Sequence, residues 1–174
     1  MPTLFNLILD VSMTTATATA TARTPAPIAT LQTGHIGLNV SDIERSKQFY
    51  QQIFGFDATL DSRESGKLFV FLTQGDRLVL TLLQQSGGSF AKDRPGLHHL
   101  SFQVDSVELV REVEARVRGA GAKIYHEGIV PHAEGAASGG IFFDDPDGIR
   151  LEVFAPSGVE GKAPSGAAPT CGFF

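Results

Sequence analysis

Residues 34–40 and 98–104 are similar to each other, and this internal repeat constrains the fold more than any other feature of the sequence. With His35 placed on His99, an offset of 64 residues, apolar residues fall at alternate positions in both segments. That alternation is typical of a β-strand with one face against a hydrophobic core. The repeat therefore predicts two copies of one structural unit.

The same offset aligns two helix-start signatures, because a Ser or Asp is followed three residues later by Glu in both halves. These signatures are Ser41-x-x-Glu44 and Asp105-x-x-Glu108. Apolar residues spaced three and four apart then predict helices over about 42–54 and 106–118. Gly55 and Gly119 stand at equivalent positions where each helix is expected to end.

Short strand-like runs follow each predicted helix. They are 57–62, 67–74 and 77–84 in the first half, and 122–127, 139–144 and 148–155 in the second half. Gly75-Asp76 and Asp145-Pro146-Asp147-Gly148 supply turns between them. Each half then reads βαβββ, which predicts an α+β fold in which two tandem βαβββ modules, 34–85 and 96–156, close a curved mixed sheet.

Both ends of the chain have biased compositions. Residues 1–33 are rich in Ala and Thr, and residues 157–174 are rich in Gly, Ala, Pro and Ser, so we expect both to be flexible tails. The only cysteine, Cys171, lies in the second tail, and this favours a cytoplasmic protein without disulfides. A net charge of −5 without a basic block argues against a nucleic-acid partner. No apolar run approaches the roughly 20 residues that would span a membrane.

Side chains on the non-core faces of the predicted strands carry the chemistry. If Ile36, Leu38 and Val40 face a core, then His35 faces the other way, and by the repeat His99 does too. In the last strand the alternation leaves Glu152 on this face, and two imidazoles and one carboxylate then form an outline of a metal site. The same alternation adds candidate residues for a substrate pocket: Ser101, Gln103, Arg150 and Phe154.

The repeat also limits the number of metal ligands. Aligning Gly75 with Gly148 places Val79 at the position equivalent to Glu152, and valine cannot bind a metal. We therefore expect three protein ligands, His35, His99 and Glu152, around one divalent ion such as Fe, Mn, Ni or Zn. The remaining positions would accept a substrate with two adjacent oxygens.

Other polar residues allow two interpretations. His98 alternates to the face opposite His99, unless the strand register slips by one residue. His126 and His132 flank a long loop, where they are either solvated or available as a proton shuttle or substrate contact. Arg150 either orients an anionic substrate or forms a structural salt bridge, as Arg77 at the equivalent place suggests.

As a set, these motifs resemble the vicinal oxygen chelate superfamily, which includes glyoxalases, bleomycin-resistance proteins and extradiol dioxygenases. The resemblance covers residues 34–156. It is carried by Gly34-His35-Ile36-Gly37-Leu38-Asn39-Val40, by Ser41-Asp42 with Phe49-Tyr50 and Gly55-Phe56, by residues 96–105, and by Phe143-Asp144-Asp145-Pro146-Asp147-Gly148-Ile149-Arg150-Leu151-Glu152.

This resemblance implies paired modules around a divalent metal, with ligands at His35, His99 and Glu152, a small-molecule substrate, and a homodimer. It leaves the reaction open between dioxygenase and glyoxalase-like lyase or isomerase chemistry. The chain has Gly37 where fosfomycin-modifying enzymes have a threonine, and Phe142 and Phe143 where ring-cleaving enzymes have a tyrosine. The alternative is a metal-free small-molecule binding protein of the bleomycin-resistance type.

Overall fold

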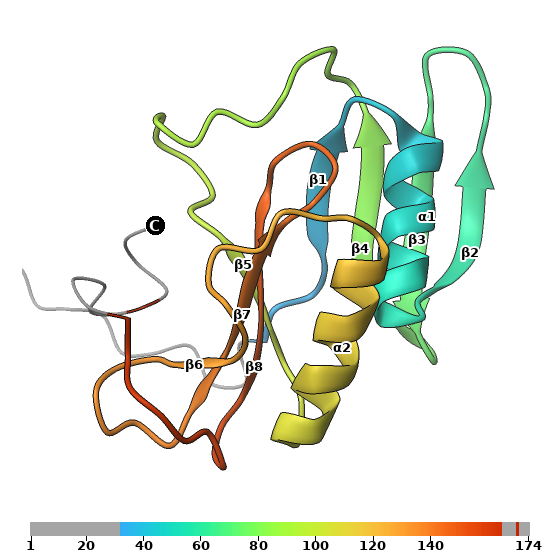
Figure 1. The fold of residues 1–174 in the computed structure, drawn as a ribbon. Coiled ribbons are helices and arrows are strands. Elements are labelled where there is room, and N and C mark those ends of the chain that lie inside the picture. The colour runs from blue at the N-terminus through green and yellow to red at the C-terminus, as the bar shows by residue number, and fades with distance from the viewer. Residues whose placement is uncertain (1–31, 165–169, 171–174) are drawn as a thin grey trace, which may run out of the picture. The chain divides into compact units, whose positions relative to one another are not determined.

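The computed structural model describes residues 32–164 and Thr170, so most of the predicted N-terminal tail and Cys171 lie outside the described residues. Two βαβββ modules follow each other along the chain (Figure 1). The first module consists of β1 (Ile36–Val40), α1 (Ile43–Phe54), β2 (Asp57–Ser62), β3 (Phe69–Gln74) and β4 (Arg77–Gln84). The second consists of β5 (Leu100–Gln103), α2 (Val107–Gly119), β6 (Val130–Pro131), β7 (Gly139–Asp144) and β8 (Arg150–Ala155). The predicted α+β fold and its duplication are confirmed.

Each module forms its own four-stranded mixed sheet. The strand orders are β1-β4-β3-β2 and β5-β8-β7-β6, and in each sheet the first two strands are parallel. The two sheets are separate and do not close on each other within the described part of the chain. β1 and β5 are therefore edge strands.

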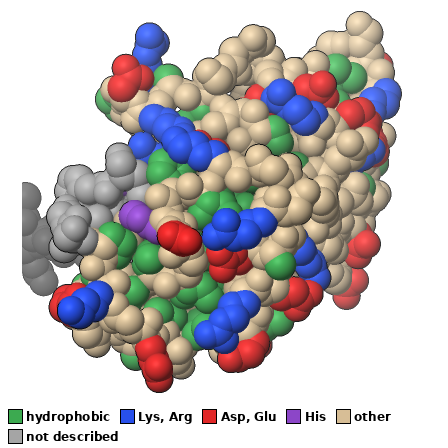
Figure 2. Space-filling view, viewed as in Figure 1, with side chains coloured by type: hydrophobic (Ala, Val, Ile, Leu, Met, Phe, Trp, Pro, Cys, Tyr) green, Lys and Arg blue, Asp and Glu red, His purple; other side chains and the backbone are tan. Residues whose placement is uncertain are grey.

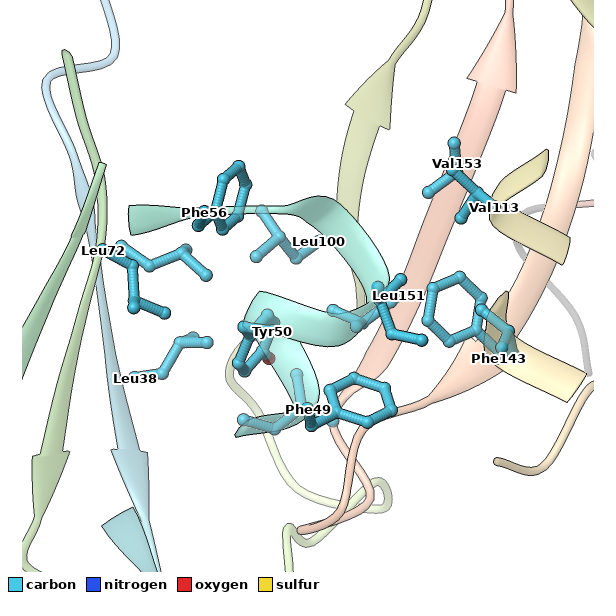
Figure 3. Packing of buried hydrophobic residues seen from close by; sticks show 14 of the residues in the cluster. Leu38, Phe49, Tyr50, Phe56, Leu72, Leu100, Val113, Phe143, Leu151 and Val153 are labelled. Atoms are coloured by element: carbon cyan, nitrogen blue, oxygen red, sulfur yellow. The ribbon is translucent and has the colours of Figure 1, made fainter. Parts of the chain in front are cut away.

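The helices pack between the two sheets. α1 contacts β3 and β4, α2 contacts β7 and β8, and the helices contact each other. In Figure 3, Phe49 and Tyr50 of α1 lie between Leu38 and Leu72 on one side and Leu151 on the other. Burying these apolar faces together supplies the main stabilisation, at about 25 cal/mol per Å². The opposite face of each sheet, called here its outer face, points away from the helices.

Both helices begin one residue later than the sequence signatures predicted. The Asp42 carboxylate accepts a hydrogen bond from the Arg45 backbone N–H at 3.0 Å, and Ser106 plays the same part for α2. Gly55 ends α1 with a φ of 69°, as predicted. Helix α2 instead continues through Gly119 and is capped by Ala120.

The turn that joins β7 to β8 connects the two modules. The Tyr50 hydroxyl of α1 donates to the Asp145 carboxylate at 2.9 Å, and the Arg45 guanidinium pairs with Asp147 at 2.7 Å. Burial raises the pKa of Asp145 to about 6, although hydrogen bonds from Ile149, Tyr50 and Asp147 act in the opposite direction. The predicted turn is thus also a buried contact with the first module.

The long connection from α2 to β7 differs from the prediction. Residues 122–127 were expected to form a strand, but they contribute only an isolated bridge between Ile124 and Phe143. The additional strand is β6, in a segment that the sequence suggested was loop. After β8, Val159 is buried and its N–H donates to the Ala137 carbonyl at 2.9 Å, so the described start of the C-terminal tail packs on this connection.

On the face shown in Figure 2, Lys and Arg side chains are interspersed with Asp and Glu side chains. Within the described residues, no helix is long and apolar enough to cross a bilayer.

Candidate functional site

Two of the predicted metal ligands meet on the outer face of the second-module sheet. β5 and β8 are parallel neighbours with Ser101 opposite Glu152, and His99 immediately precedes β5. His99 Nε2 lies 3.5 Å from Glu152 Oε2, and the Glu152 side chain is only 5% exposed. A carboxylate that is removed from water to this extent needs cationic or hydrogen-bonding partners.

The spacing of this pair suits a divalent metal. Two ligands bound at about 2.1 Å to one tetrahedral or octahedral ion lie about 3.0–3.4 Å apart. Burial lowers the pKa of His99 from its ordinary value, although the nearby Glu152 carboxylate acts in the opposite direction. The imidazole is therefore neutral at neutral pH, which is the form that binds metals. His99 and Glu152 fit as two ligands of one ion.

His35 does not join this pair within one chain. It precedes β1 in the other module and is exposed. In the part of the chain that the structure describes, no three His, Cys, Asp or Glu side chains are grouped so as to hold a metal. His35 instead lines a cavity of about 720 Å³ together with Ser101 and Gln103. Arg150 and Phe154 are absent from the lining of that cavity and belong to the outer face that carries Glu152.

A third imidazole, that of His132, contacts Glu152. His132 Nε2 lies 2.8 Å from Glu152 Oε1, the carboxylate oxygen other than the one facing His99. Its Nδ1 lies 3.0 Å from the Ser138 hydroxyl. Since the hydroxyl can donate to Nδ1, the neutral ring can donate from Nε2 to the carboxylate. Both oxygens of Glu152 therefore face an imidazole.

Two glycines in β7 allow the neighbouring strands to come close, and the first of them affects His132. A Cβ atom on Gly139 would lie 2.3 Å from the Val130 carbonyl oxygen, and one on Gly140 would lie 2.1 Å from the Val153 carbonyl oxygen. Without a side chain at Gly139, β6 comes close to β7 and brings His132 onto the outer face, whereas Gly140 allows the close approach of β8 on the other side. In the sequence, His132 is one of two histidines that flank a long loop, with no feature of its own that places it beside Glu152. The Gly139-Gly140 pair in a predicted strand was the signal that could have assigned it.

The strand register corrects the predicted counterpart of Glu152. In the second module, Ser101 lies two residues after His99 and pairs with Glu152. In the first module, Gly37 lies two residues after His35 and pairs with Thr81. The counterpart is therefore Thr81, and not Val79. The Thr81 hydroxyl is buried and has no hydrogen-bond partner among the described residues.

His98 lies on the same side of the sheet as the pair, contrary to the alternation argument. Its Nδ1 lies 2.8 Å from His99 Nδ1, and its Nε2 lies 3.3 Å from Arg150 Nη1. Both histidines precede β5, so strand alternation does not govern them. His126 packs edge-on against Phe142 at 5.8 Å, and burial lowers its pKa.

Three relatives each align with about 70% of the length of this chain. The uncharacterized protein YqjT of Bacillus subtilis is 30% identical over 71% of this chain and 98% of its own length. A probable trivalent organoarsenical cleaving enzyme of the same species is 29% identical over 69% of this chain and 77% of its own length. Its catechol-2,3-dioxygenase is 26% identical over 70% of this chain and 40% of its own length.

Solved structures show the same fold. A glyoxylase/bleomycin resistance protein/dioxygenase domain from a Frankia species superposes with a TM-score of 0.63 at 29% identity, covering 75% of this chain and 94% of its own. The fosfomycin resistance protein FosX of Listeria monocytogenes, complexed with Mn(II) and a dihydroxypropylphosphonic acid, has a TM-score of 0.57 at 23% identity, over 75% of this chain and 95% of its own.

The family model that matches covers residues 32–153, which include the first module, the second module up to Val153 in β8, and all three predicted ligands. The chain therefore belongs to the Glyoxalase/Bleomycin resistance protein/Dioxygenase superfamily.

Proposed function

We propose that this protein is a metal-dependent enzyme that binds a small oxygen-bearing substrate to a divalent ion held by His99 and Glu152. The observation that carries the proposal is the 3.5 Å separation of His99 Nε2 and Glu152 Oε2 around a buried carboxylate. The Mn(II) bound by the structural relative FosX agrees with a divalent ion at such a site.

We propose that the third ligand is His35 of a second copy of the chain. The helices lie between the two sheets, so the outer face that carries Glu152 points away from the helical layer. A first module from another copy could cover that face and present its own His35. The protein would then be a homodimer with two equivalent sites, each made from both copies.

The residues around Glu152 have separate tasks in this proposal. The bound ion would supply Lewis-acid stabilisation of negative charge that develops on a substrate oxygen. His132 holds the Oε1 oxygen of Glu152 through Nε2, and Ser138 fixes the His132 ring through Nδ1. Hydrogen bonds of this kind orient a ligating carboxylate and adjust its basicity.

We assign the reaction to dioxygenase or glyoxalase-like lyase or isomerase chemistry. The names of two relatives, an organoarsenical cleaving enzyme and a catechol dioxygenase, belong to this range. Trivalent arsenic prefers thiol ligands, and this chain has one cysteine, Cys171. Substrates with two adjacent oxygens, such as catechols, are therefore the first to test.

The metal assignment is tested by elemental analysis of protein purified anaerobically. We expect about one ion per chain in the wild type and its loss in His99→Ala, while His126→Ala serves as the histidine control and keeps the ion. Metal content that is unaltered in His99→Ala would refute the assignment. A wild type that binds small molecules but takes up no metal would instead support the bleomycin-resistance type of function.

The shared site is tested by mixing two metal-deficient variants, His35→Ala and Glu152→Gln. In a mixed dimer one site combines the intact His35 of one chain with the intact His99 and Glu152 of the other. Random exchange of subunits should therefore restore metal at about a quarter of the sites. If the mixture binds no more metal than the separate variants, the ligands do not come from two chains.

A further inference from the structure

The described residues after β8 contact the connection between β6 and β7 at three points. At each point a backbone N–H of the later segment donates to an oxygen of the connection. The acceptor moves from the β7 end toward the β6 end as the donor moves along the chain. The pairs are Val159 with Ala137 at 2.9 Å, Ala163 with Glu134 at 3.2 Å, and Thr170 with His132 at 2.9 Å. The last of these contacts reaches the residue that holds Glu152.

Thr170 donates hydrogen bonds to two consecutive carbonyl groups at the end of β6. Its backbone N–H donates to the His132 carbonyl at 2.9 Å, and its hydroxyl donates to the Pro131 carbonyl at 2.8 Å. Because Thr170 is fully buried, water does not compete for these donors. The two carbonyls belong to the peptide groups on either side of the His132 Cα atom. Holding both planar groups fixes the backbone dihedral angles of His132 and therefore the direction of its Cβ atom.

The backbone around His132 depends on such support because β6 is short. This strand has only two residues and lies at the edge of its sheet, so its ladder with β7 holds it weakly. The His132 N–H donates to the Ser138 carbonyl at 3.0 Å, but residues 133–135, which follow, are exposed. The two bonds from Thr170 are therefore a large part of what anchors this segment.

The His132 side chain transmits this anchoring to the candidate metal site. Its Nε2 lies 2.8 Å from Glu152 Oε1, and its ring centroid lies 5.2 Å from that of Phe154 on the same outer face. A change in the direction of the His132 Cβ atom would move Nε2 away from the carboxylate, because a hydrogen bond weakens steeply with distance and angle. Thr170 therefore acts on Glu152 through His132.

We propose that Thr170 is a positioning residue of the metal site: it fixes the backbone of His132, and His132 in turn orients Glu152 for the ion. A carboxylate that is oriented before the ion arrives loses less conformational freedom on binding, so the affinity for the ion is higher. The inference rests on the proposed function for the ion alone. The support of His132 by Thr170 is a property of the metal-free chain.

Amide hydrogen exchange of metal-free protein, followed by NMR, tests the support of His132. Thr170→Val keeps the shape of the side chain and removes the hydroxyl donor, whereas Thr170→Ser keeps the donor. The His132 N–H should exchange at least about threefold faster in Thr170→Val and at nearly the wild-type rate in Thr170→Ser. Thr73→Val, which alters a buried threonine of β3 in the first module, should leave this rate unchanged.

Mn(II) affinity, measured by competition with a chelator, tests the step from His132 to the ion. Thr170→Val should weaken binding by about three- to tenfold, and it should have no further effect in a His132→Ala background. Equal losses in both backgrounds, or wild-type affinity and exchange in Thr170→Val, would overturn the role of Thr170. A wild type that binds no Mn(II), although exchange at His132 responds to Thr170→Val, would instead overturn the proposed function and leave the support of His132 standing.

Discussion

The two modules share their inner faces and differ on their outer faces. Leu80 and Leu82 of β4 occupy the positions of Leu151 and Val153 of β8, and all four are fully buried against the helices. On the outer face, the first module has Thr81 with an unpartnered hydroxyl where the second has Glu152 between two imidazoles. The residues that the two modules share are thus those that pack against the helices. The polar side chains that could carry out chemistry are concentrated in the second module.

The largest change in stability should come from a substitution in β7, where the second module requires a glycine. By the same register Gly140 corresponds to Phe69 of the first module, since Gly140 pairs with Phe154 and Phe69 with Leu83. We expect Gly140→Ala to lower the free energy of unfolding by at least about 3 kcal/mol, because its Cβ would meet backbone atoms. Urea unfolding measures this change.

Gly119→Ala is the matched control for that substitution. A Cβ at Gly119 meets nothing within 4 Å, and the residue lies at the end of α2. The change should therefore raise the free energy of unfolding by up to about 1 kcal/mol. Equal effects at the two glycines would mean that β8 does not need the close approach to β7 at Gly140.

The turns that join the last two strands of each module provide the next contrast, which concerns the pH dependence of stability. The turn of the second module contains the buried carboxyl group of Asp145. Its folded-state pKa of about 6 exceeds the ordinary value of 3.8, so the folded protein holds this proton more tightly than the unfolded chain. The resulting stability is fully present below pH 3.8 and is lost as the pH rises through about 6.

Relative to Asp145→Asn, the wild type should therefore lose up to about 3 kcal/mol of unfolding free energy between about pH 4 and pH 7. Asparagine retains an oxygen for the Asp147 and Ile149 N–H groups and removes the titration. Urea unfolding of both proteins across this range gives the difference. Parallel pH profiles would show that Asp145 does not titrate in the folded state at an elevated pKa.

The smallest expected effect concerns Thr81. Because its buried hydroxyl has no partner in the described part of the chain, Thr81→Val should raise the free energy of unfolding by about 1 kcal/mol. The exposed Thr59 of β2 offers a control whose replacement by Val should change stability by less than about 0.5 kcal/mol. A destabilised Thr81→Val would indicate that the hydroxyl has a partner in solution and that the outer face of the first module is not chemically silent.

The sequence predicted the duplication and both helices, because strand alternation and helix periodicity are local signals. It also predicted the approach of His99 to Glu152, although His99 precedes β5 and strand alternation does not govern it. It did not predict His132, whose position depends on the approach of β6 to Gly139 in β7. It also placed the counterpart of Glu152 at Val79, because it aligned glycines in turns of unequal length. The pairs that close the two turns show this difference in length. Gln74 pairs with Arg77 across the short turn of the first module, whereas Asp144 pairs with Arg150 across the longer turn of the second.

The separation of His35 from Glu152 within one chain could not be predicted from the sequence. Alternation assigned it a face, but the packing of both helices between the sheets sends the two outer faces apart. That arrangement depends on contacts between modules, such as Phe49 with Phe143 and Tyr50 with Asp145, which no local pattern reveals.

The central claim is that the carboxylate of the second module, and no group at its counterpart in the first, binds the metal. Metal content per chain, measured by mass spectrometry of Glu152→Gln and Thr81→Val after identical anaerobic purification, tests it directly. We predict that Glu152→Gln loses at least about nine-tenths of the metal, because the amide removes the charge that holds the ion, and that Thr81→Val keeps it. A Glu152→Gln protein with the metal content of the wild type would contradict the account.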